Sequence, residues 1–376
     1  MKQDYFLRKI DRKRTKRSKE GVYKYTYHKS DGSSANPNEV KEIKNMVKEL
    51  ALPHAWNNVR VYKKRTAKVR AKGYDVQCRP QSIYNDTYVK SQKKKKFSHM
   101  KVIGKNFEDI EQKINSDIRR KSDDEQFKIA MVLKLIITCN IRIGGKQWLT
   151  PDTYWVDKLQ GDDISKEIDK RGIKTRKKST LERKKERIRE DARKPTYGAS
   201  TLMKEHIILQ GDKIKIKFTG KSGVDNECVI TDKKVGKALK ELKKEASGDG
   251  YLFKYNGEFI SPKKINDYLG PSITSKNLRT WLCNVEYIKY ILQNKKKYEG
   301  VMNNDEIVTK STKDVSESLH NTPSVCKSSY IHPGITNHFI KAPNKFGERF
   351  SNNGKINEDY IRKQYLKFLK KKSRRS

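Results

Sequence analysis

Four side chains in this sequence have the types and surroundings needed to act on a phosphodiester: two arginines, a lysine and a tyrosine. The chain has no metal-ligand cluster, no phosphate-cradling glycine loop and no grouped carboxylates. Chemistry on a phosphodiester would therefore use cationic donors for the phosphate charge and a hydroxyl to attack phosphorus. The candidates are Arg142, Lys221, Arg279 and Tyr330.

Arg142 and Lys221 both lie where a chain can present a cation to a ligand. Arg142 follows the apolar run 126–141, so its guanidinium must be paired or must point into a polar cavity. Lys221 lies between Gly220 and Gly223 at the tip of an expected hairpin, where the backbone can turn tightly and approach another molecule. Each also has an ordinary interpretation, a structural salt bridge for Arg142 and a solvated turn for Lys221.

Arg279 and Tyr330 are expected on helices. Trp281 anchors a helix from which Arg279 emerges at the edge of the core. Thr322, followed by a proline, predicts the start of a short helix that Pro333 ends soon after Tyr330. An arginine that packs its stem and a tyrosine that packs in the core are the alternative interpretations.

The elements that must position these side chains predict an α+β fold. Alternating short runs broken by turn signals indicate a small β-rich N-terminal domain, with one helix at 38–50. The run 126–141 is apolar almost all round, as in a helix buried in a larger, mainly helical domain. Within that domain, the strand 213–218 and its neighbour 227–231 form a β-hairpin.

Charge and apolar spacing divide the chain into four parts. Residues 1–20 are a basic arm, 21–105 the β-rich domain, 106–345 the helical domain and 346–376 a basic tail. The segment 156–196 has almost no large apolar side chains, so it is expected to be an exposed charged insertion.

The charge balance predicts a polyanionic partner. Lys and Arg number 87 against 45 Asp and Glu, which gives a net charge of +42. Nucleic acid is the first candidate. A membrane surface is the competing polyanion, but no apolar stretch approaches the roughly 18 to 20 residues of a spanning helix and no signal core is present. We expect an intracellular protein that binds no membrane.

The cysteines indicate no disulfide framework and no zinc site. They are odd in number and widely spaced along the chain. We expect them to be reduced and mostly buried. They are Cys78, Cys139, Cys228, Cys283 and Cys326.

Taken together, the four stretches of sequence that contain these candidate side chains resemble the poxvirus, giant-virus and bacterial branch of type IB DNA topoisomerases. That family has an arginine in an R-[IF]-G turn, a lysine in F-x-G-K, an arginine in K-x-x-R-T-[WY] and a tyrosine that closes a helix beginning T-P. Arg142, Lys221, Arg279 and Tyr330 fall on these positions in the same order. The resemblance covers most of the chain.

The position before the T-P pair departs from the poxviral pattern. Poxviral members have a histidine there, whereas this chain has Asn321, as bacterial and giant-virus members do. An amide NH2 can donate to a non-bridging phosphate oxygen as an imidazole does. His320, next to it, stays open as a substitute.

The resemblance implies a mechanism without ATP or an essential metal. Tyr330 would attack phosphorus and form a 3′-phosphotyrosyl link, which releases a 5′-hydroxyl, and after strand rotation the reverse reaction would reseal the DNA. Arg142, Arg279 and Asn321 would stabilise the transition-state charge on the non-bridging oxygens. Lys221 would protonate the leaving 5′-oxygen.

The resemblance also implies that two domains clamp double-stranded DNA. Residues 52–56 and 78–84 resemble the small domain of the family, in which Gln81 and Tyr84 would reach base edges in the major groove. We expect a monomer located with DNA, in a virion, a viral factory or the nucleus. Further expected DNA contacts are Lys146, Lys276 and His320.

Two other functions remain open at this point. A tyrosine recombinase would share the Arg, Lys, Arg and Tyr chemistry, but recombinases usually have a histidine at the position of Lys276. A non-catalytic basic DNA-packaging protein would explain the charge without explaining four ordered motifs. Replacing Tyr330 by Phe separates these cases, because binding should survive and relaxation should not.

Overall fold

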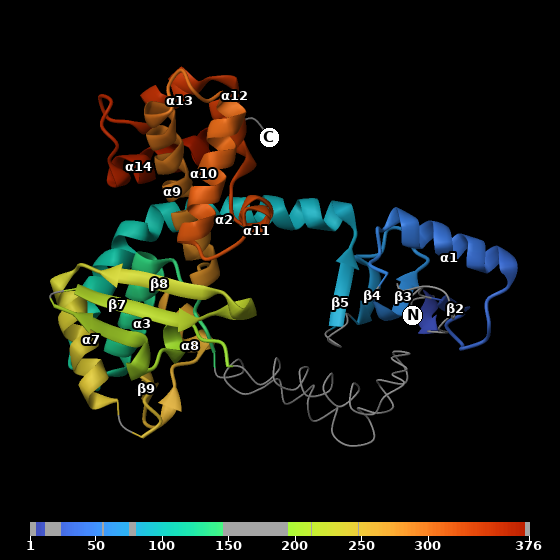
Figure 1. The fold of residues 1–376 in the computed structure, drawn as a ribbon, viewed down its shortest axis with the longest axis horizontal. Helices are drawn as coiled ribbons and strands as arrows, with labels where there is room; N and C mark the ends of the chain where they lie inside the picture. The colour runs from blue at the N-terminus through green and yellow to red at the C-terminus, as the bar shows by residue number, and fades with distance from the viewer. Residues whose placement is uncertain are drawn as a thin grey trace. The chain divides into compact units, whose positions relative to one another are not determined.

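The computed structural model describes residues 5–11, 24–54, 56–74, 80–145, 195–211, 213–246 and 248–372 (Figure 1). These residues form two compact units, one up to Lys94 and the other from Lys95 onward. The boundary falls inside helix α2 (Asp86–Asp117), whereas the sequence placed it near 105. The lysine run 93–96, expected as an edge or linker, is therefore part of a continuous helix. The expected insertion 156–196 lies outside the described residues up to 194.

The N-terminal unit is a five-stranded antiparallel sheet with one helix, α1 (Pro37–Glu49), against it. The strand order is β2-β1-β3-β4-β5, so β5 is an edge strand. Ile43 and Met46 of α1 join Val59, Val61 and other sheet residues in one small core. The strands are β1 (Tyr5–Asp11), β2 (Lys24–His28), β3 (Asn57–Tyr62), β4 (Val69–Tyr74) and β5 (Pro80–Tyr84).

Strand β1 corrects the expected basic arm at 1–20. Residues 5–11 pair with β2 on one side and β3 on the other, and Phe6 is buried in the core. Arg8 is only 1% exposed, and its Nη2 donates to the carbonyls of Pro53 and Trp56 at 3.0 and 3.2 Å. A charged side chain that is buried and paired looks like part of a solvated arm when only the sequence is read.

The second unit is mainly helical and encloses the larger core, which confirms the α+β prediction. Helix α3 (Glu125–Cys139) is buried nearly all round, and Asp124 caps it by accepting from the Phe127 amide at 3.0 Å. Helix α9 (Ser275–Lys297) lies beside α3 in the same core. The other helices are α7 (Lys233–Glu245), α8 (Pro262–Tyr268), α10 (Asn304–Ser318), α11 (Pro323–Ser329), α12 (Pro333–Lys341), α13 (Pro343–Phe350) and α14 (Glu358–Lys372).

A three-stranded sheet in this unit contains the expected hairpin. Strands β6 (Ile207–Gln210), β7 (Lys213–Thr219) and β8 (Asp225–Ile230) are antiparallel in that order. Ile214, Ile216 and Phe218 of β7 face the core while its lysines face outward, as the alternation predicted. A short second ribbon pairs β9 (Lys254–Tyr255) with β10 (Glu258–Phe259).

Helices α13 and α14 correct the expected basic tail at 346–376. Phe346, Phe350 and Tyr365 are fully buried, and the Tyr365 ring stacks on Trp281 of α9 with centroids 4.9 Å apart. The apolar side chains of α14 lie on one face of a helix whose other face carries the lysines. The high lysine and arginine content of this segment therefore led us to miss an amphipathic helix that packs in the core. Residues 373–376 lie outside the described residues.

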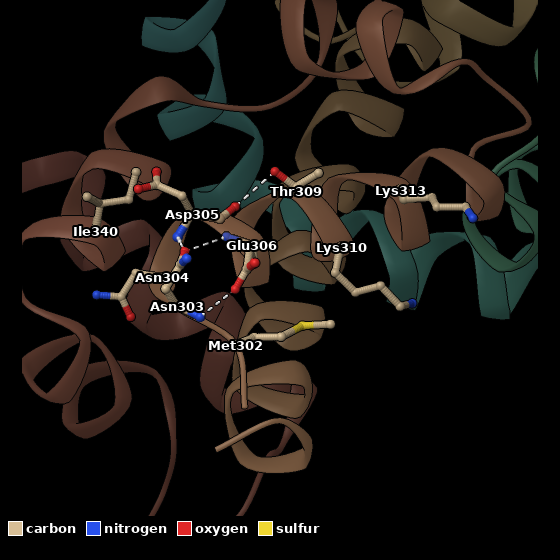
Figure 2. A pocket seen from close by; sticks show the side chains of 9 residues that line it. All are labelled: Met302, Asn303, Asn304, Asp305, Glu306, Thr309, Lys310, Lys313 and Ile340. Atoms are coloured by element: carbon tan, nitrogen blue, oxygen red, sulfur yellow. Dashed lines mark hydrogen bonds between the residues drawn. The ribbon is translucent and has the colours of Figure 1, made fainter. Parts of the chain in front are cut away.

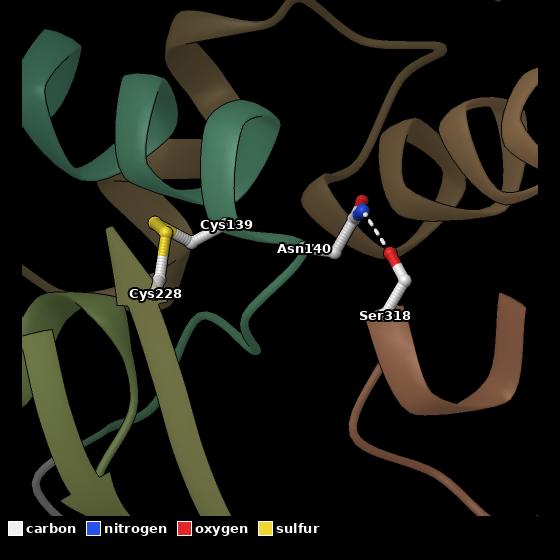
Figure 3. Close-up of a disulfide and its surroundings, with 4 residues drawn as sticks. All are labelled: Cys139, Asn140, Cys228 and Ser318. Atoms are coloured by element: carbon white, nitrogen blue, oxygen red, sulfur yellow. Dashed lines mark hydrogen bonds between the residues drawn. A yellow bond between two sulfur atoms is a disulfide. The ribbon is translucent and has the colours of Figure 1, made fainter. Parts of the chain in front are cut away.

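Two of the cysteines are paired, contrary to the expectation that all are reduced. Cys139, the last residue of α3, and Cys228 of β8 form a disulfide although 89 residues separate them in the sequence (Figure 3). Wide spacing suggested unpaired thiols because it does not show which elements lie side by side. Cys283 and Cys326 are free and buried, as expected. Cys78 lies outside the described residues.

Candidate active site

Arg279 of α9 contacts Tyr330 directly. The Arg279 Nη1 donates to the Tyr330 hydroxyl at 3.2 Å, and the guanidinium carbon lies 5.5 Å from the centre of the tyrosine ring. Both side chains are nearly buried, with 4% of Arg279 and 7% of Tyr330 exposed. The guanidinium therefore lies beside the oxygen that would attack phosphorus.

Two backbone carbonyls fix the orientation of the Arg279 guanidinium. Its Nε donates to the Asn140 carbonyl at 2.8 Å and its Nη2 donates to the Leu319 carbonyl at 3.2 Å. Asn140 ends α3 in the left-handed conformation, with φ of 52°. Its side-chain NH2 donates to Glu286 Oε2 at 2.9 Å. The same NH2 donates to the Ser318 hydroxyl at 3.1 Å, the bond drawn in Figure 3. The arginine is thus held by neutral acceptors from two segments.

Arg142 and Asn321 form a second pair. Arg142 is half-buried two residues beyond Asn140, and its Nη2 donates to the Asn321 Oδ1. The Asn321 NH2 donates to the Leu319 carbonyl at 3.2 Å, the same carbonyl that accepts from Arg279. One carbonyl therefore connects the Arg142–Asn321 pair to the Arg279–Tyr330 pair.

Tyr330 lies at the end of the short helix that the sequence predicted. Thr322 is the N-cap, with its hydroxyl accepting from the Val325 amide at 3.3 Å, and proline occupies the first helical position. The Tyr330 amide donates to the Cys326 carbonyl at 2.9 Å, so Tyr330 is the C-cap of α11. The helix presents the tyrosine at its last turn rather than along its side.

Asn284 of α9 holds the backbone on both sides of Tyr330, and the sequence reasoning missed it. Its NH2 donates to the Tyr330 carbonyl at 3.0 Å and to the Thr280 carbonyl at 2.7 Å. Its Oδ1 accepts from the His332 amide at 2.7 Å. The signal in the sequence was a polar residue, five beyond Arg279, inside an apolar helix.

Helix α2 also contacts the backbone next to Tyr330. The Lys96 Nζ donates to the Ser329 carbonyl at 2.8 Å, and the Phe97 ring packs on His332 with centroids 4.5 Å apart. Lys96 belongs to a lysine run, so nothing in its sequence context distinguishes it from a solvated lysine.

Lys221 lies on the exposed turn between β7 and β8. A 3-10 turn spans Lys221–Gly223, and the Gly220 amide donates to the Val224 carbonyl at 2.8 Å to close the loop. A Cβ on Gly220 would lie 2.4 Å from the Asn226 side-chain nitrogen, so any other residue there would have to displace the Asn226 amide from its bond to the Val224 carbonyl. The hairpin tip therefore depends on the glycine that precedes the lysine.

The segment 195–201 connects the Arg142 turn to the hairpin. The Ala199 amide donates to the Arg142 carbonyl at 2.8 Å, and the Tyr197 amide donates to the Thr219 carbonyl at 3.0 Å. Gly198 packs against Gly144, and a Cβ on Gly198 would lie 2.5 Å from the Gly144 nitrogen. This contact requires two glycines far apart in the sequence.

Burial changes the protonation equilibria of two side chains at the site. Loss of water lowers the pKa of the Arg279 guanidinium, and Tyr330 opposes this change while Arg142 adds to it. Burial also lowers the pKa of His320, and the nearby Arg279 lowers it further. His320 is half-buried with φ of 51°, and its surroundings favour the neutral form of the ring.

The expected DNA contacts lie in both units. Gln81 and Tyr84 are on the edge strand β5 of the N-terminal unit, where Tyr84 is 42% exposed and its ring lies 5.4 Å from that of Tyr88. Lys276 is exposed in the first turn of α9. Lys146 lies outside the described residues.

A separate pocket of about 680 Å³ lies at the start of α10 (Figure 2). It is lined by the capping residues Asn303 and Glu306, together with Met302 and Ile340. None of the candidate catalytic side chains lines it.

Within the described ranges, no group of three or more His, Cys, Asp or Glu side chains is arranged to hold a metal ion. Likewise, no described helix is both long and apolar enough to cross a membrane.

Comparison with known proteins gives two kinds of similarity. The family described as eukaryotic DNA topoisomerase I, catalytic core, matches residues 177–353, which include Lys221, Arg279, Asn321 and Tyr330. DNA topoisomerase 1B of Acanthamoeba polyphaga mimivirus is 23% identical over 336 residues, which cover 83% of this chain and 85% of the relative. DNA topoisomerase I of monkeypox virus and DNA topoisomerase 1B of vaccinia virus are each 28% identical over 138 residues, which cover 36% of this chain and 43% of either relative.

Proposed function

Because this chain belongs to the type IB DNA topoisomerases, we propose that it relaxes supercoiled DNA by cutting and resealing one strand through Tyr330. The observation that carries the assignment is the hydrogen bond from Arg279 to the Tyr330 hydroxyl, 3.2 Å long and nearly buried. A buried tyrosine hydroxyl needs a hydrogen-bond partner in any protein, but here the partner is a cationic donor, which can also stabilise the negative charge of a phosphate under attack.

Tyr330 attacks phosphorus and displaces the 5′-oxygen of the cut strand. The tyrosine becomes joined to the 3′-phosphate and the other fragment leaves with a 5′-hydroxyl. The strand rotates about the intact strand, and attack by the 5′-hydroxyl then releases Tyr330. One phosphodiester replaces another, so the bond energy is kept without ATP.

Arg142, Arg279 and Asn321 stabilise the charge of the five-coordinate transition state. Arg142 donates to Asn321, and Asn321 donates to the Leu319 carbonyl, which also accepts from Arg279. A phosphate that enters would replace the Arg142–Asn321 bond with bonds to its own oxygens, which are stronger acceptors. These donors supply the charge that a metal supplies in other phosphoryl-transfer enzymes.

Lys221 is the general acid that protonates the leaving oxygen. An alkoxide is far more basic than a phenolate, whose conjugate acid has a pKa of about 10, so the leaving group needs a proton more than Tyr330 needs a base. The turn of the β7–β8 hairpin carries Lys221 on an exposed loop, where it can enter a DNA groove. Its ammonium is a compact donor on a flexible stem.

Type IB topoisomerases generally act on DNA without ATP or a metal, and we propose the same for this chain. The enzyme would clamp double-stranded DNA as a monomer, with Gln81 and Tyr84 of β5 at base edges. Lys146, Lys276 and His320 would contribute further contacts. The site of action would be intracellular and with DNA.

The test is relaxation of supercoiled plasmid in EDTA without ATP. The wild-type protein should relax the plasmid, and detergent should trap a covalent adduct on the 3′ side of the cut. Tyr330→Phe should lose both while it still binds DNA. A wild-type protein that binds DNA without relaxing it would favour a recombinase or a packaging protein instead.

A further inference from the structure

The Cys139–Cys228 disulfide (Figure 3) joins the end of α3 to strand β8, and each of these two elements leads to a residue of the proposed active site. Cys139 is followed by Asn140, whose carbonyl accepts from Arg279, and Arg142 lies two residues further along. Cys228 lies on β8, one strand of the hairpin that carries Lys221. A single covalent bond therefore connects the end of the helix that leads to Arg142 with the hairpin that carries Lys221.

The hairpin has a second attachment near its tip. The Tyr197 amide donates to the Thr219 carbonyl, and two residues later the Ala199 amide donates to the Arg142 carbonyl. Cys228 pairs with Ile216, three rungs of the ladder before the Thr219–Asp225 pair. At about 3.3 Å per residue, the two attachments are about 10 Å apart. Strand β7 is also held by its pairing with β6 and by the buried side chains of Ile214, Ile216 and Phe218. The disulfide is the covalent attachment of β8, the strand that follows the Lys221 turn.

We propose that the Cys139–Cys228 disulfide is a positioning element for Lys221, so that strand cleavage depends on the oxidation state of this pair. The inference rests on the proposed function of Lys221. Breaking the disulfide leaves Arg142, Arg279 and Tyr330 with their own hydrogen bonds and leaves β7 in the core, but it removes the covalent hold on β8 and so loosens the Lys221 turn. Proton donation to the leaving oxygen is then the step that suffers.

Reduction of this bond is a balanced exchange with a dithiol such as dithiothreitol. A reagent thiolate attacks one sulfur, the other sulfur leaves as a thiolate, and the second reagent thiol closes a cyclic disulfide. The protein gains two electrons and two protons and ends with two thiols. Cys228 is partly exposed, which gives the reagent a route to the bond.

The other cysteine pair does not account for an effect of reductant. The sulfurs of Cys283 and Cys326 are 3.9 Å apart and not bonded to each other. Cys283 lies four residues after Arg279, and Cys326 lies four residues before Tyr330. Both are already thiols, so dithiothreitol leaves them unchanged.

The experiment first maps the disulfide by mass spectrometry of the unreduced protein and then measures single-turnover cleavage. The DNA carries either an ordinary linkage or a 5′-bridging sulfur at the cut site. A thiolate leaves without a proton donor, because a thiol has a pKa of about 8.5 and an alcohol is far less acidic. The cleavage rate of the sulfur substrate therefore depends on DNA binding, attack by Tyr330 and transition-state stabilisation, but not on proton donation to the leaving group.

We expect a linked peptide pair that contains Cys139 and Cys228. Reduction should slow cleavage of the ordinary linkage by about tenfold or more, since small displacements of a catalytic group have effects of this size. The sulfur substrate should be cut at the same rate by the oxidised and the reduced enzyme. Cys139→Ser with Cys228→Ser should behave as the reduced enzyme and should not respond to dithiothreitol.

Lys221→Ala separates failure of this inference from failure of the proposed function. If Lys221→Ala cuts the ordinary linkage slowly but cuts the sulfur substrate at the wild-type rate, Lys221 is the proton donor. If the variant is slow on both substrates, the assignment of Lys221 as proton donor fails, and this inference fails with it. With Lys221 established, the inference alone is overturned by an absent Cys139–Cys228 peptide pair, by no effect of reduction, or by equal slowing on both substrates.

Discussion

Arg279 donates to three acceptors from three segments: the Asn140 carbonyl, the Leu319 carbonyl and the Tyr330 hydroxyl. A planar guanidinium can serve all three at once because its N–H groups point in fixed directions. A lysine has the charge but only one nitrogen. The residue type at this position therefore follows from geometry as well as from charge.

Replacing Arg279 by Lys should slow single-turnover cleavage by about 10²–10³-fold, as expected for loss of a transition-state donor. The fold should remain intact by circular dichroism, and DNA binding should be nearly unchanged. Wild-type cleavage rates in Arg279→Lys would show that charge alone suffices and would contradict the proposed role of the guanidinium.

The contacts of Asn284 with the backbone around Tyr330 predict that Asn284 positions the nucleophile. Asn284→Ala removes the bonds to the Tyr330 carbonyl and the His332 amide, so cleavage should fall by about tenfold to a hundredfold through misplacement of the nucleophile. Asn294→Ala is the matched control, because Asn294 is buried on the same helix but bonds Ser311 and Asp314. Each should lose about 1–3 kcal/mol of stability. Equal cleavage rates in the two variants would contradict the positioning role.

His320 predicts a pH effect. Burial and Arg279 lower its pKa from the ordinary value of 6.5, so the folded protein resists its protonation more than the unfolded chain does. The neutral histidine is fully compatible with the fold above pH 6.5, and stability is lost as the pH falls below that value. His320→Gln should therefore reduce the fall in melting temperature between pH 7 and pH 5. An unchanged fall would show that His320 takes no part in it.

At the scale of elements, the segment 195–201 holds the Arg142 turn by backbone contact. Ala199 and Ser200 donate to the carbonyls of Arg142 and Ile143, each at 2.8 Å. Such contacts need the two backbones to approach more closely than side chains allow, which explains the facing glycines Gly144 and Gly198. The element is short, but it fixes where α3 delivers its arginine.

Gly198→Ala should displace this segment, because the new Cβ would lie 2.5 Å from the Gly144 nitrogen and 2.7 Å from the Arg142 carbonyl oxygen. We expect cleavage to fall by about tenfold or more. Gly236→Ala is the control, since its Cβ would lie 3.6 Å from Ile214 and alanine stabilises a helix interior by roughly 0.8–1 kcal/mol. Full activity in Gly198→Ala, measured beside this control, would mean that the contact does not position Arg142.

Local patterns predicted the elements whose signals are local. The apolar run of α3, the alternation of β7 and the Thr322 cap of α11 each depend on neighbouring residues, and each element was found near its expected bounds. Strand β1 and helix α14 were missed because their charged side chains are paired or lie on an outer face. The disulfide and the Asn284 contacts depend on packing between distant segments, which a single sequence does not reveal.

For the whole molecule, the net charge of +42 predicts how binding responds to salt. Each phosphate that the protein neutralises releases counterions. A plot of the logarithm of the binding constant against the logarithm of the salt concentration should therefore have a negative slope of about 0.9 for each phosphate contact. Tyr330→Phe allows binding to be measured without cleavage. Its affinity for duplex DNA should fall by at least about a hundredfold from 50 to 200 mM salt. Affinity that hardly changes would mean that the positive charge is not directed at phosphates.

Helix α14 packs on α9 through the stacked rings of Tyr365 and Trp281. Ribosomes make residues 358–372 after Tyr330, so the nucleophile exists before the surface that completes its supporting core. A nascent chain halted between the two lacks the Tyr365 ring that stacks on Trp281, two residues after Arg279. The packing of the helix that carries Arg279 is therefore completed only after every residue of the candidate site has been synthesised.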